Sequence, residues 1–205
     1  MTHTTPCAQA HLAELVRAAA GFRAGIELAD RWGTTLASVL DAGGRLLAAG
    51  NGGSAAQAQH LTAELVGRYR DDRPPYSAIC LNAETSSLTA IGNDYPPEEL
   101  FARQVEAHGR PGDVLVLMST SGRSANIVAA AERGRRCGLR VWGFTGPGPN
   151  PLAEAADETL CVDARFTATV QELHLVALHA LCAGLDRELG VIPAEAGVPQ
   201  VEARA

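Results

Sequence analysis

Aromatic residues are scarce in this chain of 205 residues. Phe, Trp and Tyr together make up 4% of it, whereas alanine is used heavily. We therefore expect the helices to pack through small and aliphatic side chains. The length suits one ordinary domain with a small helical addition, long enough to bury a core. Hydrophobic residues at 46% and charged residues at 20% are close to the globular average.

Cysteines are few, odd in number and scattered. The five lie without any Cys-x-x-Cys pair, at positions Cys7, Cys80, Cys137, Cys161 and Cys182. This spacing is unsuitable for a disulfide framework or a zinc knuckle. We expect reduced, mostly buried thiols in a cytoplasmic protein.

The chain also lacks an excess of positive charge and a long apolar run. Its net charge of −6 argues against non-specific binding to nucleic acid or to an anionic membrane, although a local cationic site stays open. Residues 1–9 hold no basic stretch followed by an apolar one, so we expect no signal peptide. No uninterrupted apolar run approaches the ~20 residues of a membrane span.

Apolar runs alternate with stretches of helical spacing along the chain. Residues 11–40 predict two helices or one kinked helix, with Gly21 and Gly33 as breaks. Short apolar runs predict strands over residues 45–49, 77–81, 114–118, 140–144 and 159–162. Helical patterns cover residues 54–66, 84–91, 96–108, 124–137, 152–156 and 169–189.

This alternation predicts an α/β three-layer sandwich, a doubly wound parallel sheet of about five strands flanked by helices. We expect an N-terminal helical segment over residues 1–42 that packs on the domain or on a partner subunit. The domain itself would span residues 43–190, and residues 191–205 would form a loose tail.

Ligands of parallel sheets bind beyond the carboxyl ends of the strands. That rule selects residues 50–54, 82–87, 119–124 and 145–148, and two of these segments carry a chemical signal. Residues 50–54 form a Gly-rich turn at a helix start, with Asn51, Gly52, Gly53 and Ser54; taken alone it is a weak signal, and it is neither a Walker A loop nor a dinucleotide fingerprint. Residues 119–124 are the stronger signal, because Ser119, Thr120, Ser121 and Ser124 crowd a helix start where backbone N–H groups are free. One capping hydroxyl leaves the others without a role, so we favour a phosphate site.

Two helices carry residues suited to metal or acid–base chemistry. His60 and Glu64 are spaced i, i+4 and share one helix face. Gln171, His174 and His179 lie on the apolar final helix, where a polar group needs a partner, and we expect His179 to point inward. Taken singly, a surface ion pair or a satisfied core histidine would explain each of them.

Together these segments resemble the sugar isomerase (SIS) domain, and more closely the phosphoheptose isomerases. The resemblance runs from about residue 12 to 189 and rests on Gly-Asn-Gly-Gly-Ser at 50–54, His60 with Glu64, Gly92-Asn93-Asp94, Ser-Thr-Ser-Gly-x-Ser-Ala-Asn at 119–126, and Gln171 with His174 and His179. The serine-rich segment identifies only the superfamily. The set His60, Glu64, Gln171 and His179 is far more specific to the isomerase.

The resemblance implies a site for each of these residues. Asn51, Gly52, Gly53, Ser54, Glu64, Asn93, Asp94 and Gln171 would contact a sugar phosphate, and Ser119, Thr120, Ser121 and Ser124 would hold its phosphate. His60, Glu64, Gln171 and His179 would bind one Zn2+ per subunit, with Glu64 and His179 as the acid–base pair. The implied reaction converts sedoheptulose 7-phosphate to D-glycero-D-manno-heptose 7-phosphate through an enediol. The family forms homotetramers with sites at subunit interfaces.

Two features leave alternatives open. The family commonly has Asp-Arg shortly before the glutamine, and here Thr167-Ala168-Thr169-Val170 precedes Gln171, so another sugar phosphate is an alternative substrate. Gln171 and His179 are also roughly 12 Å apart along a straight helix, so the ligands could be divided between subunits. A non-catalytic SIS module, a sugar-phosphate sensor or a tetrameric adaptor, is the rival class.

Overall fold

The computed structural model describes residues 7–192, and its centre is one parallel sheet. Five strands are hydrogen-bonded in the order β2-β1-β3-β4-β5. Their bounds are β1 Leu46–Gly50, β2 Ala78–Cys80, β3 Val114–Ser119, β4 Arg140–Thr145 and β5 Glu158–Cys161. Each neighbouring pair is parallel. The predicted doubly wound α/β sandwich is confirmed, and each strand begins within one residue of its predicted start.

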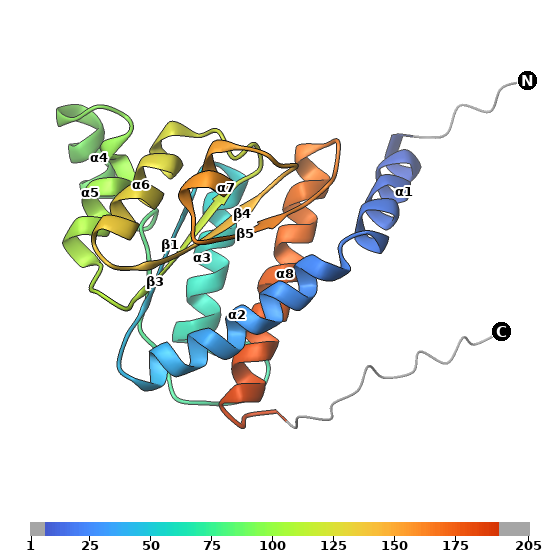
Figure 1. Ribbon diagram of the computed structural model, residues 1–205, viewed down its shortest axis with the longest axis horizontal. Helices are drawn as coiled ribbons and strands as arrows, with labels where there is room; N and C mark the ends of the chain where they lie inside the picture. The colour runs from blue at the N-terminus through green and yellow to red at the C-terminus, as the bar shows by residue number, and fades with distance from the viewer. Residues whose placement is uncertain (1–6, 193–205) are drawn as a thin grey trace, which may run out of the picture.

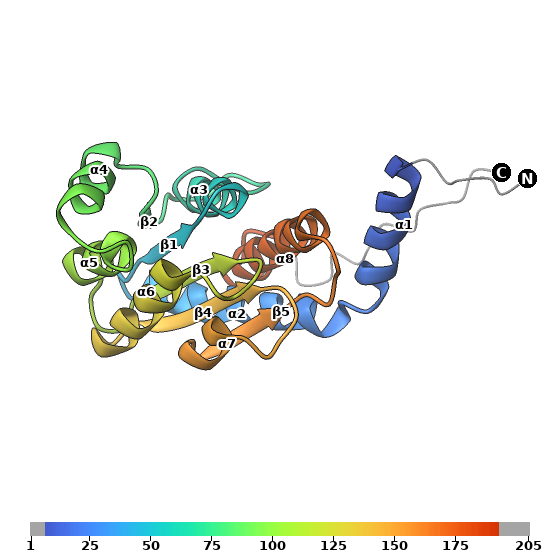
Figure 2. The ribbon, with the colours of Figure 1, turned by 90° about the horizontal axis from the view of Figure 1, so that it is seen from above.

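Eight helices surround the sheet in the described residues, as Figures 1 and 2 show. They are α1 Cys7–Ala20, α2 Arg23–Asp41, α3 Gly53–Val66, α4 Thr85–Asp94, α5 Glu99–His108, α6 Ala125–Arg136, α7 Pro151–Ala155 and α8 Thr167–Glu188. The two faces of the sheet bury separate apolar clusters, because successive strand side chains point to opposite sides. Leu46 and Val116 pack with α2, α3 and α8, whereas Leu47 and Leu115 pack with α5, α6 and α7.

The helices α2 and α8 approach each other backbone to backbone. A Cβ atom on Gly33 would lie 2.2 Å from the Leu181 carbonyl oxygen, and one on Gly184 would lie 2.5 Å from that of Asp30. The predicted break at Gly33 is therefore wrong: α2 runs through it, and the glycine serves close packing instead. Trp32 of α2 stacks on Trp142 of β4 with ring centroids 4.9 Å apart, so the few aromatics are concentrated in the core.

Three further expectations can be compared with the structure. The helix predicted over residues 84–91 extends further, because residues 92–94 complete the last turn of α4. All five cysteines are free, yet only Cys80 and Cys182 are buried, so the expectation of mostly buried thiols is wrong. The predicted tail over residues 191–205 lies outside the described residues beyond residue 192.

One helix, α8, is long and apolar enough by length and composition to cross a membrane. Of its most apolar window, 56% is buried inside the structure. It packs against α2 and α3 and contributes Leu178 and Leu181 to the core. Core helices of globular domains meet the same criterion.

Candidate active site

The side chains of His60, Glu64 and His179 converge where α3 and α8 pack together. His60 Nε2 lies 3.0 Å from Glu64 Oε1 and 3.2 Å from His179 Nε2. The i, i+4 spacing on α3 places the first two on one face, and helix packing supplies the third. Three potential ligand atoms thus lie within 4.8 Å of one another, although His179 is 119 positions from His60.

The surroundings of His179 favour its neutral imidazole. Partial burial lowers its pKa first, the neighbouring His60 lowers it further, and Glu64 acts in the opposite direction. The ring of Tyr69 stacks on it, with centroids 5.6 Å apart. Burial raises the pKa of Tyr69, which keeps its hydroxyl protonated at neutral pH. Tyr69 is a contact that sequence reasoning missed.

These three residues fit a zinc ion by their chemistry. Two imidazoles and one carboxylate are ligands that zinc uses at catalytic sites, where a further position stays open for substrate. With metal–ligand bonds of about 2.0–2.1 Å, tetrahedral ligand atoms lie roughly 3.3 Å apart. Two of the three separations, 3.0 and 3.2 Å, are close to that value, and all three atoms lie within 4.8 Å of one another.

Gln171 is not brought to this group within the chain. Its side chain lies against Gly53 at the start of α3, where a Cβ atom would be 2.5 Å from Gln171 Nε2. Gln57 Nε2 donates to the Gln171 carbonyl oxygen at 2.6 Å. Gly53 precedes His60 by seven residues, roughly 10 Å along the helix. Gln171 therefore neighbours the Gly-rich turn rather than the three converging side chains.

The inward-pointing histidine of α8 is His174, not His179 as predicted. His174 is fully buried, whereas His179 is partly exposed. His174 Nε2 lies 3.1 Å from the Thr145 carbonyl oxygen, and its ring meets Phe144 edge-on. Burial lowers its pKa to about 4. The neutral ring thus donates to the end of β4 beneath the site.

The serine-rich turn after β3 brings the first and last of its hydroxyls together. Ser119 Oγ and Ser124 Oγ lie 3.2 Å apart, and Ser121 Oγ accepts from the Arg123 N–H. Ser124 occupies the N-cap position of α6, but its side chain makes no capping hydrogen bond. The hydroxyl is thus not consumed by helix capping, the alternative that would explain a lone serine here.

Two asparagines tie the Gly-rich turn to the serine-rich turn. Asn51 Nδ2 donates to Asn126 Oδ1 at 2.9 Å, and Asn126 Nδ2 donates back to Asn51 Oδ1 at 3.0 Å. The Asn82 side chain makes two hydrogen bonds to the backbone of Gly50. Its Oδ1 accepts from the Gly50 N–H at 3.1 Å, and its Nδ2 donates to the Gly50 carbonyl oxygen at 2.8 Å. Sequence reasoning selected the segment that begins at Asn82, because it follows a strand end, but it did not predict the contacts of Asn82 with Gly50 or the pairing of Asn126 with Asn51.

The remaining predicted residues fall into two places. Gly52 has a φ of +55° and no atom within 4 Å of an added Cβ, and Ser54 is buried beneath the turn. Asn93 and Asp94 are exposed at the end of α4, where Asn93 Nδ2 donates to Asp94 Oδ1. Figures 1 and 2 show α4 beside α5, at the edge of the molecule away from α8. A single chain therefore does not bring Asn93 and Asp94 to His179.

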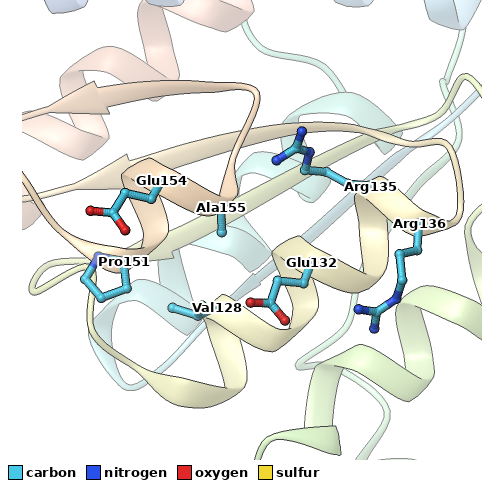
Figure 3. A pocket seen from close by; sticks show the side chains of 7 residues that line it. All are labelled: Val128, Glu132, Arg135, Arg136, Pro151, Glu154 and Ala155. Carbon is cyan, nitrogen blue, oxygen red and sulfur yellow. The ribbon is translucent and has the colours of Figure 1, made fainter.

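A groove between α6 and α7 is separate from these residues (Figure 3). Its lining includes Glu132, Arg135, Arg136 and Glu154, and none of the predicted site residues. The lining holds two acidic and two basic side chains, and Arg135 is paired with Asp157 at 3.4 Å. Its charges compensate one another, so it offers no concentrated charge to a sugar phosphate.

The family model of the SIS domain matches residues 22–146, a range that includes both the Gly-rich turn and the serine-rich turn. The chain is 65% identical to a phosphoheptose isomerase of Streptomyces coelicolor over 87% of its own length and 78% of the relative. It is 50% identical to the phosphoheptose isomerase of Rhodospirillum rubrum, over 76% of this chain and 82% of the relative. The solved phosphoheptose isomerase GmhA of Neisseria gonorrhoeae superposes with a TM-score of 0.80 at 38% identity, covering 87% of this chain and 96% of that one.

The chain therefore belongs to the phosphoheptose isomerase family and is an isomerase. The expected family resemblance is confirmed, and membership of an isomerase family argues against the rival class of non-catalytic SIS modules.

Proposed function

We propose that this isomerase interconverts sedoheptulose 7-phosphate and D-glycero-D-manno-heptose 7-phosphate, with zinc bound by His60, Glu64 and His179. The observation that carries the proposal is the convergence of two imidazoles and one carboxylate within 4.8 Å, on helices distant in sequence. A bound zinc ion would supply Lewis-acid polarisation of the substrate's oxygens.

The proton transfers are assigned to Glu64 and His179. Isomerisation of a ketose to an aldose moves a proton between adjacent carbons, which requires a base at carbon and an acid at oxygen. Oxygen Oε1 of Glu64 faces His60, which leaves its other oxygen for the carbon-bound proton. His179 exchanges the proton at the substrate oxygen, and the stacked ring of Tyr69 holds the imidazole in orientation.

The phosphate is assigned to the turn of Ser119, Thr120, Ser121 and Ser124. Its supports are the hydroxyls of Ser119 and Ser124, which face each other, and the start of α6, whose backbone N–H groups attract an anion. The Gly-rich turn with Asn51 would contact the sugar between this phosphate and the reacting carbons. Binding energy from the remote phosphate can then position those carbons.

We further propose a homotetramer in which sites are completed between subunits. The supports are exposed apolar side chains: Leu12 and Val16 on α1 are 60% and 62% exposed, and Val176 on α8 is 50% exposed. Figure 2 shows α1 projecting away from the sheet. In such an assembly, Gln171, Asn93 and Asp94 would reach the metal or the sugar of a neighbouring subunit. Light scattering after gel filtration measures the mass directly, and a monomer would contradict this proposal.

The test of the reaction is incubation of pure zinc-loaded protein with sedoheptulose 7-phosphate, followed by detection of aldoheptose 7-phosphate. Glu64→Gln should remove turnover and leave the circular dichroism spectrum unchanged. Glu132→Gln, in the groove between α6 and α7, is the matched control and should retain wild-type activity. No turnover by the wild type with zinc present would sink the proposal.

The residues before Gln171 favour testing a second candidate substrate, a different sugar phosphate. Thr169 stands in the first turn of α8, fully buried and with its hydroxyl unpartnered in the described residues, where the family commonly has Asp-Arg nearby. Assays with other ketose phosphates, run beside the heptulose, decide the matter. A higher kcat/KM for a shorter sugar would reassign the substrate while leaving the isomerase chemistry intact.

A further inference from the structure

Arg73 is the one arginine that the described structure buries almost completely. It lies in the loop after α3, and its side chain is 1% exposed. Its Nε donates to Asp186 Oδ1 of α8 at 2.9 Å, and the Asp186 side chain is 0% exposed. A buried ion pair is weak evidence for stability, because desolvation offsets the attraction between the charges. Its position suggests another role.

The guanidinium also binds the end of α3. Its Nη2 donates to the Glu64 carbonyl oxygen at 2.7 Å, and its Nη1 donates to the Leu65 carbonyl oxygen at 3.0 Å. These carbonyls belong to the last turn of the helix, where no intrahelical partner is available and a positive charge is favourable. One planar group thus holds the backbone of Glu64 on α3 and a carboxylate on α8.

These contacts of Arg73 lie on the same two helices as His60, Glu64 and His179. Asp186 follows His179 by seven residues, two helical turns, so the two lie on the same side of α8. Glu64 is both the residue whose carbonyl Arg73 binds and the residue whose carboxylate faces His60. The contact therefore fixes α3 against α8 beside the three potential ligands.

We propose that Arg73 is a positioning residue: it sets the separation of Glu64 and His60 from His179, and with it metal affinity and turnover. The inference rests on the proposed function for the roles of these three residues. Lysine cannot reproduce the contact, because its ammonium lacks the planar fork that reaches two carbonyls and a carboxylate together.

The test compares Arg73→Lys with Arg187→Lys. Arg187 is the matched control, since it follows Asp186 on α8 and forms a two-bond pair with Asp30 of α2, but does not contact α3. Arg73→Lys should weaken Co2+ binding by about 10-fold or more and lower kcat by a similar factor, since loss of a contact that supports metal ligands has effects of this size. Co2+ binding is read from the visible absorption of the bound ion. KM should change little, because Arg73 does not contact the serine-rich turn that is assigned to the phosphate. Arg187→Lys should match the wild type in both readouts.

A second variant separates positioning from folding. Arg73→Met/Asp186→Leu replaces the buried pair with apolar side chains of similar size, an exchange that often preserves stability. We expect a thermal midpoint near that of the wild type together with the same loss of kcat and Co2+ affinity.

Wild-type activity and affinity in both Arg73 variants would overturn the inference, as would an equal loss in Arg187→Lys. Because Co2+ binding needs no substrate, a wild type that binds Co2+ without turnover would contradict the proposed reaction and still let the affinities decide the role of Arg73. A wild type that binds no Co2+ would overturn both.

Discussion

The Nε2 atoms of His60 and His179 lie 3.2 Å apart, although the two residues are 119 positions apart in the chain. Two imidazole nitrogens at this distance either share one hydrogen or direct their lone pairs at a common cation. Glu64, 3.0 Å from His60, adds the negative charge that favours the second arrangement. This relationship predicts a native protein that zinc stabilises.

Zinc removal should therefore lower both stability and activity. A ligand that binds only the folded state stabilises it by about 2.7 kcal/mol at 100 times its dissociation constant. When zinc is added to chelator-treated protein, we expect the midpoint temperature of thermal unfolding to rise and turnover to return. His60→Ala should show neither effect. His108→Ala, at an exposed helix end, is the control and should respond like the wild type. Equal zinc shifts in the two variants would place the metal elsewhere.

The paired amides of Asn51 and Asn126 predict a binding defect rather than a chemical one. Asn126→Ala removes both hydrogen bonds between the two turns, each worth about 1 kcal/mol. We expect KM for the sugar phosphate to rise roughly 10-fold, as about 1–2 kcal/mol of positioning is lost, with little change in kcat. Asn126→Asp keeps one acceptor for Asn51 and should be intermediate. A fall in kcat at constant KM would assign the pair to the chemical step instead.

The fold could be predicted because its signals are local. The run over residues 114–118 is apolar throughout and bounded by turns, which is how a doubly covered parallel strand appears in sequence. The break expected at Gly33 failed because a glycine inside a helix has two explanations. Local propensity cannot distinguish a stop from close packing, and here the approach of α8 decides.

The site was predictable only in part, because local sequence patterns do not reveal tertiary contacts. His60 and Glu64 are one helical turn apart, so sequence spacing alone pairs them. The partnership with His179 came through the family resemblance, and which histidine of α8 points inward was predicted wrongly. Side-chain direction on a helix that is apolar nearly all round depends on its neighbours, and burial of His174 beneath Thr145 could not be known beforehand. Asn126 and Arg73 act through tertiary contacts that leave no local pattern.

Gly122, in the serine-rich turn, should tolerate an added side chain less well than Gly112 does. The φ of Gly122 is +62°, and an added Cβ would lie 2.0 Å from Asn150 Oδ1 and 2.7 Å from Thr145 Oγ1. Gly112 has a φ of +91° but no atom within 4 Å of an added Cβ, so it isolates the backbone strain. Gly112→Ala should cost about 1–2 kcal/mol of unfolding free energy, and Gly122→Ala about 1–3 kcal/mol more through overpacking. Urea unfolding measures both costs, and equal values would mean that the turn relaxes freely.

His174 predicts how stability depends on pH. Burial lowers its pKa from 6.5 to about 4, so between these values the unfolded chain binds a proton that the folded chain refuses. Stability should fall as the pH decreases from about 6.5 toward 4, by an amount on the order of 3 kcal/mol in all. His174→Gln keeps a donor for the Thr145 carbonyl oxygen and does not titrate. Urea unfolding of both proteins at several pH values isolates this contribution from that of the carboxylates, which is common to both. The difference in unfolding free energy between them should shift in favour of His174→Gln at low pH. Parallel curves would mean that His174 takes up its proton without unfolding, and that the contact with Thr145 tolerates a charged ring.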